Sequence, residues 1–262
     1  MSMPKVARFV VTALCLWSAC AAAQGFDHAH AAWDALLKKH VVLVAGGKAS
    51  QLRYAALARD RGALKSYLQA LSVVPEDEFA RWTRPQQMAF LINAYNALAA
   101  EKILTRYPDI RSIWDFGKIF GNPFKDEFFS LLGRKASLDW IEHEALRPRY
   151  RDPRVHYAVN CASVGCPMLR EEAYVAARLD SQLDDQARRF LSDRSRNRYA
   201  GGRLEVSRIF DWFEEDFAPR ERYFAAHAGL LATDEAARRA IEEGRTPFAF
   251  LDYDWTLNDA RP

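Results

Sequence analysis

Two cysteines and two histidines are the side chains of this sequence best suited to chemistry. Cys161 and Cys166 lie in the run NCASVGCPML, His156 precedes them by a few residues, and His143 comes earlier. A cysteine thiol becomes a nucleophile when a neighbouring imidazole takes its proton and a third polar group orients that imidazole. The combination predicts acyl transfer by Cys161, which means hydrolysis of an amide or ester, or transpeptidation.

The choice of base depends on the local structure around Cys161. RVHYAVN (154–160) alternates Val155, Tyr157 and Val159 with other residues, which predicts a short strand. In a regular strand His156 and Cys161 point to opposite faces, so we predict His143 as the base and His156 as a second catalytic histidine. Groups that would orient the base are His156, Asn160, Glu142 and Asp252.

A structural disulfide between Cys161 and Cys166 is the alternative interpretation. The four intervening residues include Gly165 and allow the α-carbons to approach within the range a disulfide requires. So small a loop would contribute about 2 kcal/mol on loop-entropy grounds. The bridge would fix a turn, and the protein would then be a non-catalytic binding or scaffold domain.

Two further kinds of site use the same residues. His143 and His156 with the two cysteines are chemically a good zinc set, but their spacing matches no known finger, and we predict no metal and no cofactor. A redox disulfide is the other possibility, although C-x4-C is not the usual C-x-x-C spacing of thiol exchangers.

The polar residues near these motifs are candidates for contact with a substrate. Asn93 and Asn96 are three residues apart on an apolar helix. Buried amides need hydrogen-bond partners, so these two also fit a role in tying the helix to a neighbouring loop. The predicted substrate-binding residues are Asn93, Asn96, Asn160 and Asp252.

The first 23 residues have the composition of a secretory signal. Lys5 and Arg8 form a basic region, an apolar run from Phe9 to Trp17 follows, and Ala21–Ala23 supplies a cleavage site. The apolar run is too short for a permanent membrane span, and no later stretch is long enough. We therefore expect a periplasmic or secreted protein, consistent with a disulfide.

Composition excludes several other classes. The chain has 262 residues, of which 50% are hydrophobic and 13% aromatic, too many for a disordered or fibrous protein. The formal net charge is +3, and it falls to +1 without Lys5 and Arg8. Near-neutrality gives no electrostatic basis for binding nucleic acid, so the expected partner is a small molecule or a peptide.

Segment patterns predict an α+β fold, mostly helical with a small β-sheet, in one domain over residues 24–262. The helix expected over 83–107 has Thr83 as its cap and Pro85 in its first turn. A helix is expected over 138–146 after a Ser137 cap, ended by Pro148. Other expected helices cover 171–191, 209–217 and 234–244, with a hairpin from residue 199 and a strand over 247–254.

Several motifs together resemble the family of unknown function DUF547. They include AFLINAYNAL from Ala89, LDWIEH from Leu138, DPRVHYAVNCAS from Asp152 and DYDWTLN from Asp252. The resemblance runs from about residue 83 to 258, with Leu91 in place of the family's usual Trp. Its signature includes Asn93, Asn96, His143, His156, Cys161 and Cys166. The family brings no secure activity, so a Cys/His-dependent hydrolase or acyltransferase acting on peptide or cell-envelope material, and a binding domain, both stay open.

Overall fold

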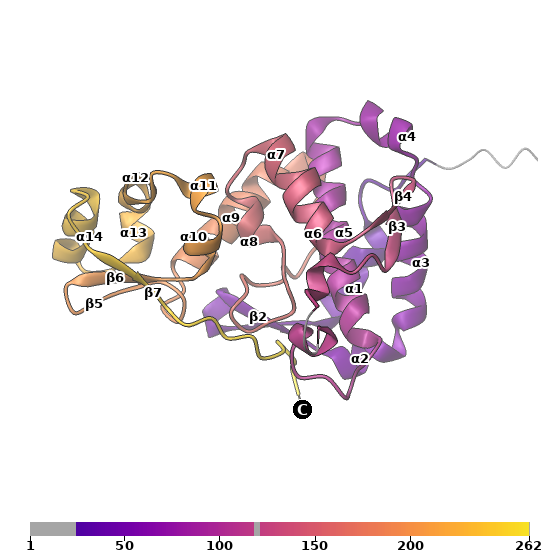
Figure 1. The fold of residues 1–262 in the computed structure, drawn as a ribbon, viewed down its shortest axis with the longest axis horizontal. Helices are drawn as coiled ribbons and strands as arrows, with labels where there is room; N and C mark the ends of the chain where they lie inside the picture. The colour runs from indigo at the N-terminus through magenta and orange to yellow at the C-terminus, as the bar shows by residue number, and fades with distance from the viewer. Residues whose placement is uncertain (1–24, 118–120, 262) are drawn as a thin grey trace, which may run out of the picture.

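The computed structural model describes residues 25–117 and 121–261. The predicted signal segment lies outside the described residues. The described chain is elongated, with α1–α5 at one end and β5–β7 with α12–α14 at the other (Figure 1). Among the described residues, no helix is both long and apolar enough to cross a membrane.

Most of the described chain is helical. The α-helices are α1 (Ala31–His40), α2 (Tyr54–Arg59), α3 (Arg61–Ser72), α4 (Glu76–Arg81), α5 (Arg84–Leu104), α6 (Leu138–Trp140), α7 (Arg147–Tyr150), α8 (Val155–Ala158), α9 (Leu179–Leu191), α10 (Ile209–Trp212), α11 (Glu214–Phe217), α12 (Arg220–Ala226), α13 (Ala228–Leu231) and α14 (Glu235–Glu242). Shorter helical turns are η1 (Ala45–Gly47), η2 (Ile113–Phe116), η3 (Pro123–Lys125), the π-helical η4 (Ile141–Leu146) and η5 (Ala176–Arg178).

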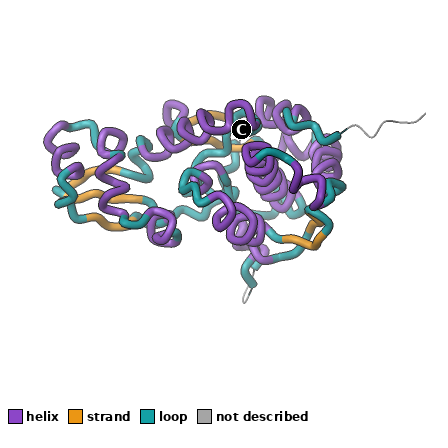
Figure 2. Tube along the Cα trace, turned by 90° about the horizontal axis from the view of Figure 1, so that it is seen from above, coloured by secondary structure: helices purple, strands orange, loops and turns teal. Residues whose placement is uncertain are grey.

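The strands form three small sheets, which Figure 2 shows as short separate pieces among the helices. The strands are β1 (Val41–Val44), β2 (Ala49–Leu52), β3 (Phe129–Leu131), β4 (Arg134–Ala136), β5 (Arg198–Ala200), β6 (Arg203–Val206) and β7 (Phe248–Phe250). The first two sheets are antiparallel pairs, and β7 joins the β5–β6 hairpin in parallel with β6. The predicted α+β class and the predicted hairpin are confirmed.

Helix α5 is the centre of the larger hydrophobic cluster. Thr83 and Gln86 form a reciprocal capping box at its start, and Pro85 lies in its first turn. From Met88 to Leu104, nearly every side chain is buried. A second cluster, built on α9 to α14, includes Phe190, Phe210 and Phe224.

Three predicted segments differ from the structure. The helix expected over 171–191 begins only with η5 at Ala176 and continues as α9. Residues 154–160 do not form a strand, because Val155–Ala158 is the helical turn α8. All four of its side chains are buried, so their alternation carries no information about an exposed face. The helix begun at Ser137 does not end before Pro148, because Pro148 lies in the first turn of α7, where no backbone donor is needed.

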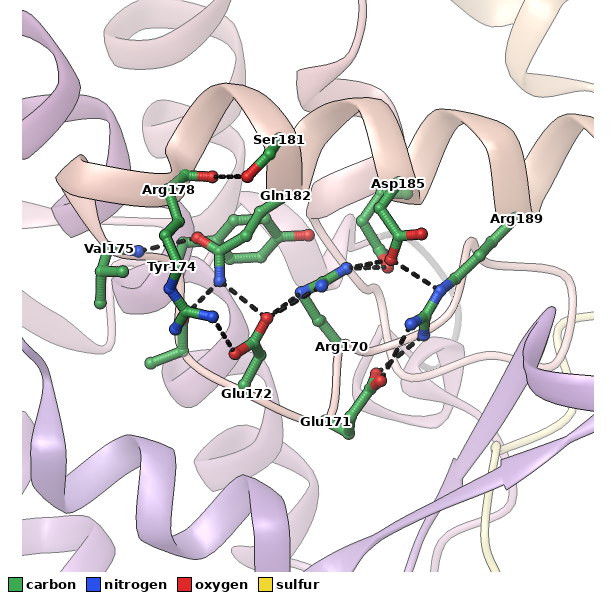
Figure 3. A network of polar contacts seen from close by, with 12 residues as sticks. Arg170, Glu171, Glu172, Tyr174, Val175, Arg178, Ser181, Gln182, Asp185 and Arg189 are labelled. Atoms are coloured by element: carbon green, nitrogen blue, oxygen red, sulfur yellow. Dashed lines mark hydrogen bonds and ion pairs between the residues drawn. The ribbon is translucent and has the colours of Figure 1, made fainter.

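A network of ion pairs braces the segment that follows the cysteines (Figure 3). The buried Arg170 guanidinium donates to Glu172 at 2.8 Å and to Asp185 of α9 at 2.7 Å. Next to it, the Gln186 amide donates to the carbonyls of Tyr157 and Met168, each at 3.0 Å. Helix α9 thus holds the chain on both sides of the cysteine loop.

The C-terminal segment, residues 251–260, runs from β7 back to β2 (Figure 1). The Leu257 N–H donates to the Arg111 carbonyl at 2.7 Å, and the Asn258 N–H donates to the Ala162 carbonyl at 3.1 Å. The Leu52 N–H donates in turn to the Asn258 carbonyl at 2.8 Å. This segment therefore connects the sheet of the second cluster to elements of the first.

Candidate functional site

The predicted cysteine and histidines line one cleft of about 500 Å³. We call it the aromatic cleft. Its lining consists of aromatic side chains, two carboxylates, two histidines and the cysteine loop: Tyr95, Trp114, Asn122, Phe124, Asp139, Glu142, His143, His156, Val159, Cys161, Cys166, Pro167, Ile209, Trp212, Phe213, Tyr253 and Trp255. The structure thus brings together residues from α5 to the C-terminal segment.

Cys161 and Cys166 form a disulfide at the wall of this cleft, with their α-carbons 6.2 Å apart. The Cys161 N–H donates to the Cys166 sulfur at 3.0 Å. The Tyr253 hydroxyl lies 3.3 Å from the Cys161 sulfur. Within residues 25–117 and 121–261, no histidine nitrogen makes a hydrogen bond to that sulfur, so the structure shows the bridged state and not a thiol–imidazole pair.

His156 lies between two carboxylates. Its Nε2 is 2.6 Å from Asp216, and its Nδ1 is 3.6 Å from Glu142. Burial alone would lower the pKa of His156, but the hydrogen bond to Asp216 and the nearby Glu142 carboxylate outweigh it and raise the pKa. The ring also stacks on Phe213, with centroids 3.9 Å apart. The arrangement favours the imidazolium, which can hold charge or donate a proton but cannot accept one.

Asp216 is the acidic partner that sequence reasoning missed. The hydrogen bond from His156 and a further one from Arg147 at 2.5 Å hold the pKa of Asp216 well below its usual range. The residue is far from His156 in sequence, in the short helix α11. No local motif connects the two, although the preceding IFDWF segment belongs to the family resemblance.

His143 is exposed, whereas His156 is buried. Its Nδ1 faces the Arg147 guanidinium at 2.8 Å, and since that group only donates, Nδ1 is the acceptor. Its Nε2 is 4.0 Å from Asp139, which lies one helical turn earlier. Arg147 therefore links His143 to the Asp216–His156 pair.

The helix that begins at Ser137 supplies one wall of the cleft. The Ser137 hydroxyl accepts the Trp140 N–H at 3.1 Å and caps this helix, as predicted. The turn η4 is π-helical, and π turns are frequent at functional sites. It presents Glu142 and His143 to the cleft.

The asparagines predicted to bind substrate form hydrogen bonds with backbone groups. Asn93 donates to the Tyr174 carbonyl at 2.7 Å and accepts the Tyr174 N–H at 3.0 Å. Asn96 makes the same paired contacts with Ala158 and Asn160 at 2.9 and 2.8 Å. These bonds confirm that the two asparagines tie α5 to neighbouring loops.

Asn160 and Asp252 are also absent from the described lining of the aromatic cleft. The Asn160 amide donates to the Pro167 carbonyl at 2.8 Å and accepts the Ala162 N–H at 3.0 Å, which fixes the disulfide loop. Asp252 is exposed and borders a smaller hollow beside Gly165. Contact of these residues with a substrate stays a prediction.

The described residues offer no ready metal site. Among them, no group of three or more histidine, cysteine, aspartate or glutamate side chains is arranged to hold a metal ion. The two cysteines are bonded to each other and provide no thiolate. The zinc set considered from sequence is therefore not assembled in this structure.

Comparison with known proteins finds a similarity to one family over part of the chain. Residues 79–191 match the model of DUF547, described as a protein of unknown function. No curated protein and no solved structure matches. The matched segment contributes Asp139, Glu142, both cleft histidines and the disulfide, whereas Trp212, Tyr253 and Trp255 come from beyond it.

Proposed function

We propose that this protein binds a small-molecule or peptide ligand in the aromatic cleft, with the disulfide and the asparagines as architecture. The observation that carries the proposal is the lining itself. Trp114 and Trp212 are 39% and 46% exposed and face an open cleft. Exposed aromatic residues around a concave apolar site are typical of ligand recognition.

Tryptophan fluorescence tests this proposal directly. Purified protein is titrated with a library of peptides, sugars and small molecules, because ligand entry changes the emission of the cleft tryptophans. We expect Trp212→Ala to weaken binding of any hit, whereas Trp33→Phe, a change in the buried core, leaves it unchanged. Hits that bind both variants equally, or a library without hits, would contradict the proposal.

Thiol-dependent hydrolysis or acyl transfer is the second candidate. One observation favours it: Cys161, His143 and His156 all line the same cleft. In this mechanism a dithiol reduces the bridge, giving two thiols and the oxidised dithiol. His143 then takes the Cys161 proton, the thiolate attacks the acyl carbon of a peptide or cell-envelope substrate, and the leaving group departs with that proton. Water or a second nucleophile finally breaks the acyl–sulfur bond and restores the thiol.

Matched cysteine variants separate the two candidates. In the hydrolase, Cys166→Ser is active on ester or peptide substrates without reductant, and Cys161→Ser is inactive with or without it. In the binding protein, neither variant nor the reduced wild type turns over substrate. Both variants lose about 2 kcal/mol of stability with the bridge, so each assay is run well below the melting temperature.

The compartment belongs to the same proposal: the protein is exported and is periplasmic or secreted. The bridged cysteines support this, because disulfides persist in oxidising compartments. Mass spectrometry of the protein from cell fractions tests it. A mature chain that begins near residue 24 outside the cytoplasm supports export, and an uncleaved cytoplasmic chain contradicts it.

A further inference from the structure

The charges around the aromatic cleft are unequal. Asp139 and Glu142 place two carboxylates in its lining, and no lysine or arginine is among the described residues that line it. His156 lies 3.6 Å from Glu142 and is the cation that offsets this carboxylate. The corresponding neighbour of Asp139 is the exposed His143, at the longer distance of 4.0 Å.

The Asp139 carboxylate has acceptor capacity that its neighbours do not use. Within the described residues it accepts no hydrogen bond, and its one ion-pair contact is the His143 Nε2 at 4.0 Å. Its side chain is 26% exposed, so it is partly withdrawn from water. An incoming donor would gain a charge-assisted hydrogen bond there at little cost in existing contacts.

The aromatic residues present rings in several orientations. Trp212 and Trp255 stack with centroids 5.6 Å apart at 27°, and Trp114 meets Trp255 edge-on at 5.3 Å and 85°. Tyr253 packs against both Trp212 and Trp255, at 4.8 and 4.6 Å. Aromatic faces are electronegative and attract cations, most strongly when the cation is desolvated.

We infer that the aromatic cleft binds an organic cation, a primary ammonium or guanidinium group on an apolar body such as a basic peptide side chain. This inference rests on the proposed function and specifies its ligand. The cationic group pairs with Asp139, and the apolar body lies against Trp212 and Trp255. An ammonium or guanidinium group only donates hydrogen bonds, which matches a carboxylate that only accepts them.

The same features disfavour other ligands. An anion would meet two carboxylates without an arginine or lysine among the described lining residues. A neutral sugar brings no positive charge to offset the Asp139 carboxylate, so it would gain less from that carboxylate than a cation does. A cation can pair with the carboxylates and contact the aromatic rings that line the cleft.

Three probes of similar shape test the charge preference. Phenethylammonium, 2-phenylethanol and 3-phenylpropanoate are titrated by tryptophan fluorescence or calorimetry, with the neutral trisaccharide of N-acetylglucosamine as a fourth probe. We expect phenethylammonium to bind at least about tenfold more tightly than the neutral alcohol. Its affinity should fall with added salt, because ion pairing is screened.

Variants locate the cation. Asp139→Asn should remove most of the preference for phenethylammonium and leave binding of the alcohol unchanged. Asp77→Asn is the matched control, since Asp77 is a 73% exposed carboxylate paired with Arg81 on α4. It should bind all probes as the wild type does.

The outcomes distinguish a failure of cation recognition from a failure of the proposed ligand binding in the aromatic cleft. Equal binding of alcohol and ammonium, tighter binding of the sugar, or an unchanged Asp139→Asn variant overturns cation recognition but leaves the cleft as a binding site. Absence of binding for every probe contradicts both.

Discussion

Aromatic rings surround a buried histidine at two places in this molecule. The N-terminal cluster consists of Phe26, His28, His30, Trp82 and Phe90, whose ring centroids lie about 4.5 to 5.6 Å apart. The aromatic cleft has the same kinds of side chain, with neighbouring ring centroids 3.9 to 6.3 Å apart. In the first, His30 and Phe90 are buried and the other three rings are partly buried, whereas the second opens to solvent at the exposed Trp114 and Trp212.

The pKa values of His30 and His156 shift in opposite directions in the two regions. His30 is 1% exposed, and burial lowers its pKa to about 4. His156 is 2% exposed, yet its pKa is raised because Asp216 and Glu142 outweigh its burial. At nearly equal burial, desolvation lowers the pKa of His30, whereas carboxylate partners raise the pKa of His156.

The largest expected difference between the regions is in packing. Phe90→Ala should lower the free energy of unfolding by about 4 kcal/mol, because Phe90 is fully buried and leaves a cavity. Trp212→Ala should cost less than about 1 kcal/mol. Chemical denaturation of both variants measures this, and similar losses would show that the cleft aromatics serve the core.

Acid should destabilise the N-terminal cluster through His30. The unfolded histidine, with a pKa of 6.5, binds a proton that the folded one resists down to about 4. Stability therefore falls as the pH drops through this window, by about 3 kcal/mol at pH 4. We expect His30→Asn, which tolerates the left-handed backbone at φ 51°, to remove that part of the acid loss.

Tyr67→Phe is the control for this prediction. It removes the hydroxyl that lies 2.7 Å from the His30 Nδ1 and keeps the imidazole. Its acid loss should match that of the wild type. If His30→Asn loses as much stability at low pH as the wild type does, groups other than His30 cause the acid destabilisation.

The cleft histidine should have the opposite pH dependence. Because the folded pKa of His156 is raised, its contribution is fully present below pH 6.5 and is lost as the pH rises through the folded pKa. Asp216→Asn should cost about 2 kcal/mol at pH 6, the worth of a hydrogen bond between charged groups. It should also flatten the decline at higher pH.

Asp211→Asn is the matched control in the same region, since Asp211 is 36% exposed and pairs with Arg208. A surface pair of this kind should contribute less than about 1 kcal/mol. Nuclear magnetic resonance titration of the His156 ring provides the direct readout. A His156 pKa that does not fall in Asp216→Asn would refute the account.

The smallest effect concerns the helix that carries Asp139, Glu142 and His143. Ser137→Ala should cost about 1 kcal/mol through loss of its cap. Asp234→Ala removes the equivalent cap of α14, where Asp234 accepts the Ala237 N–H at 2.9 Å, and should cost about the same. Only Ser137→Ala should weaken binding to the cleft, so equal binding by both variants would show that the cap does not position this wall.

Local signals explain what could be predicted from the sequence. The start of α5 depends on Thr83, Pro85 and Gln86, which are adjacent in the chain, and that prediction is accurate. The Asn93 and Asn96 ties follow from a general requirement for buried amides. The strand expected over 154–160 is wrong because an entirely buried turn has no polar face to set its period.

The rest of the site depends on contacts between distant residues. His156 and Asp216 share no motif, and the charge of the cleft follows from which carboxylates have cations beside them. Whether Cys161 is a nucleophile or half of a bridge could not be decided from spacing, since both need the same residues. In the structure the two sulfurs are bonded to each other, so Cys161 is half of a disulfide and not a free thiol.

The route of the C-terminal segment has a consequence for the order in which the protein becomes competent. Tyr253 and Trp255 line the cleft, and the neighbouring Leu257 and Asn258 bond to loops that precede them by many residues. A nascent chain that has not yet released these residues can build α5 and the disulfide loop, but its cleft lacks one wall. The cleft is therefore complete only after residues 253–258 have been synthesised and have packed against the loops that precede them.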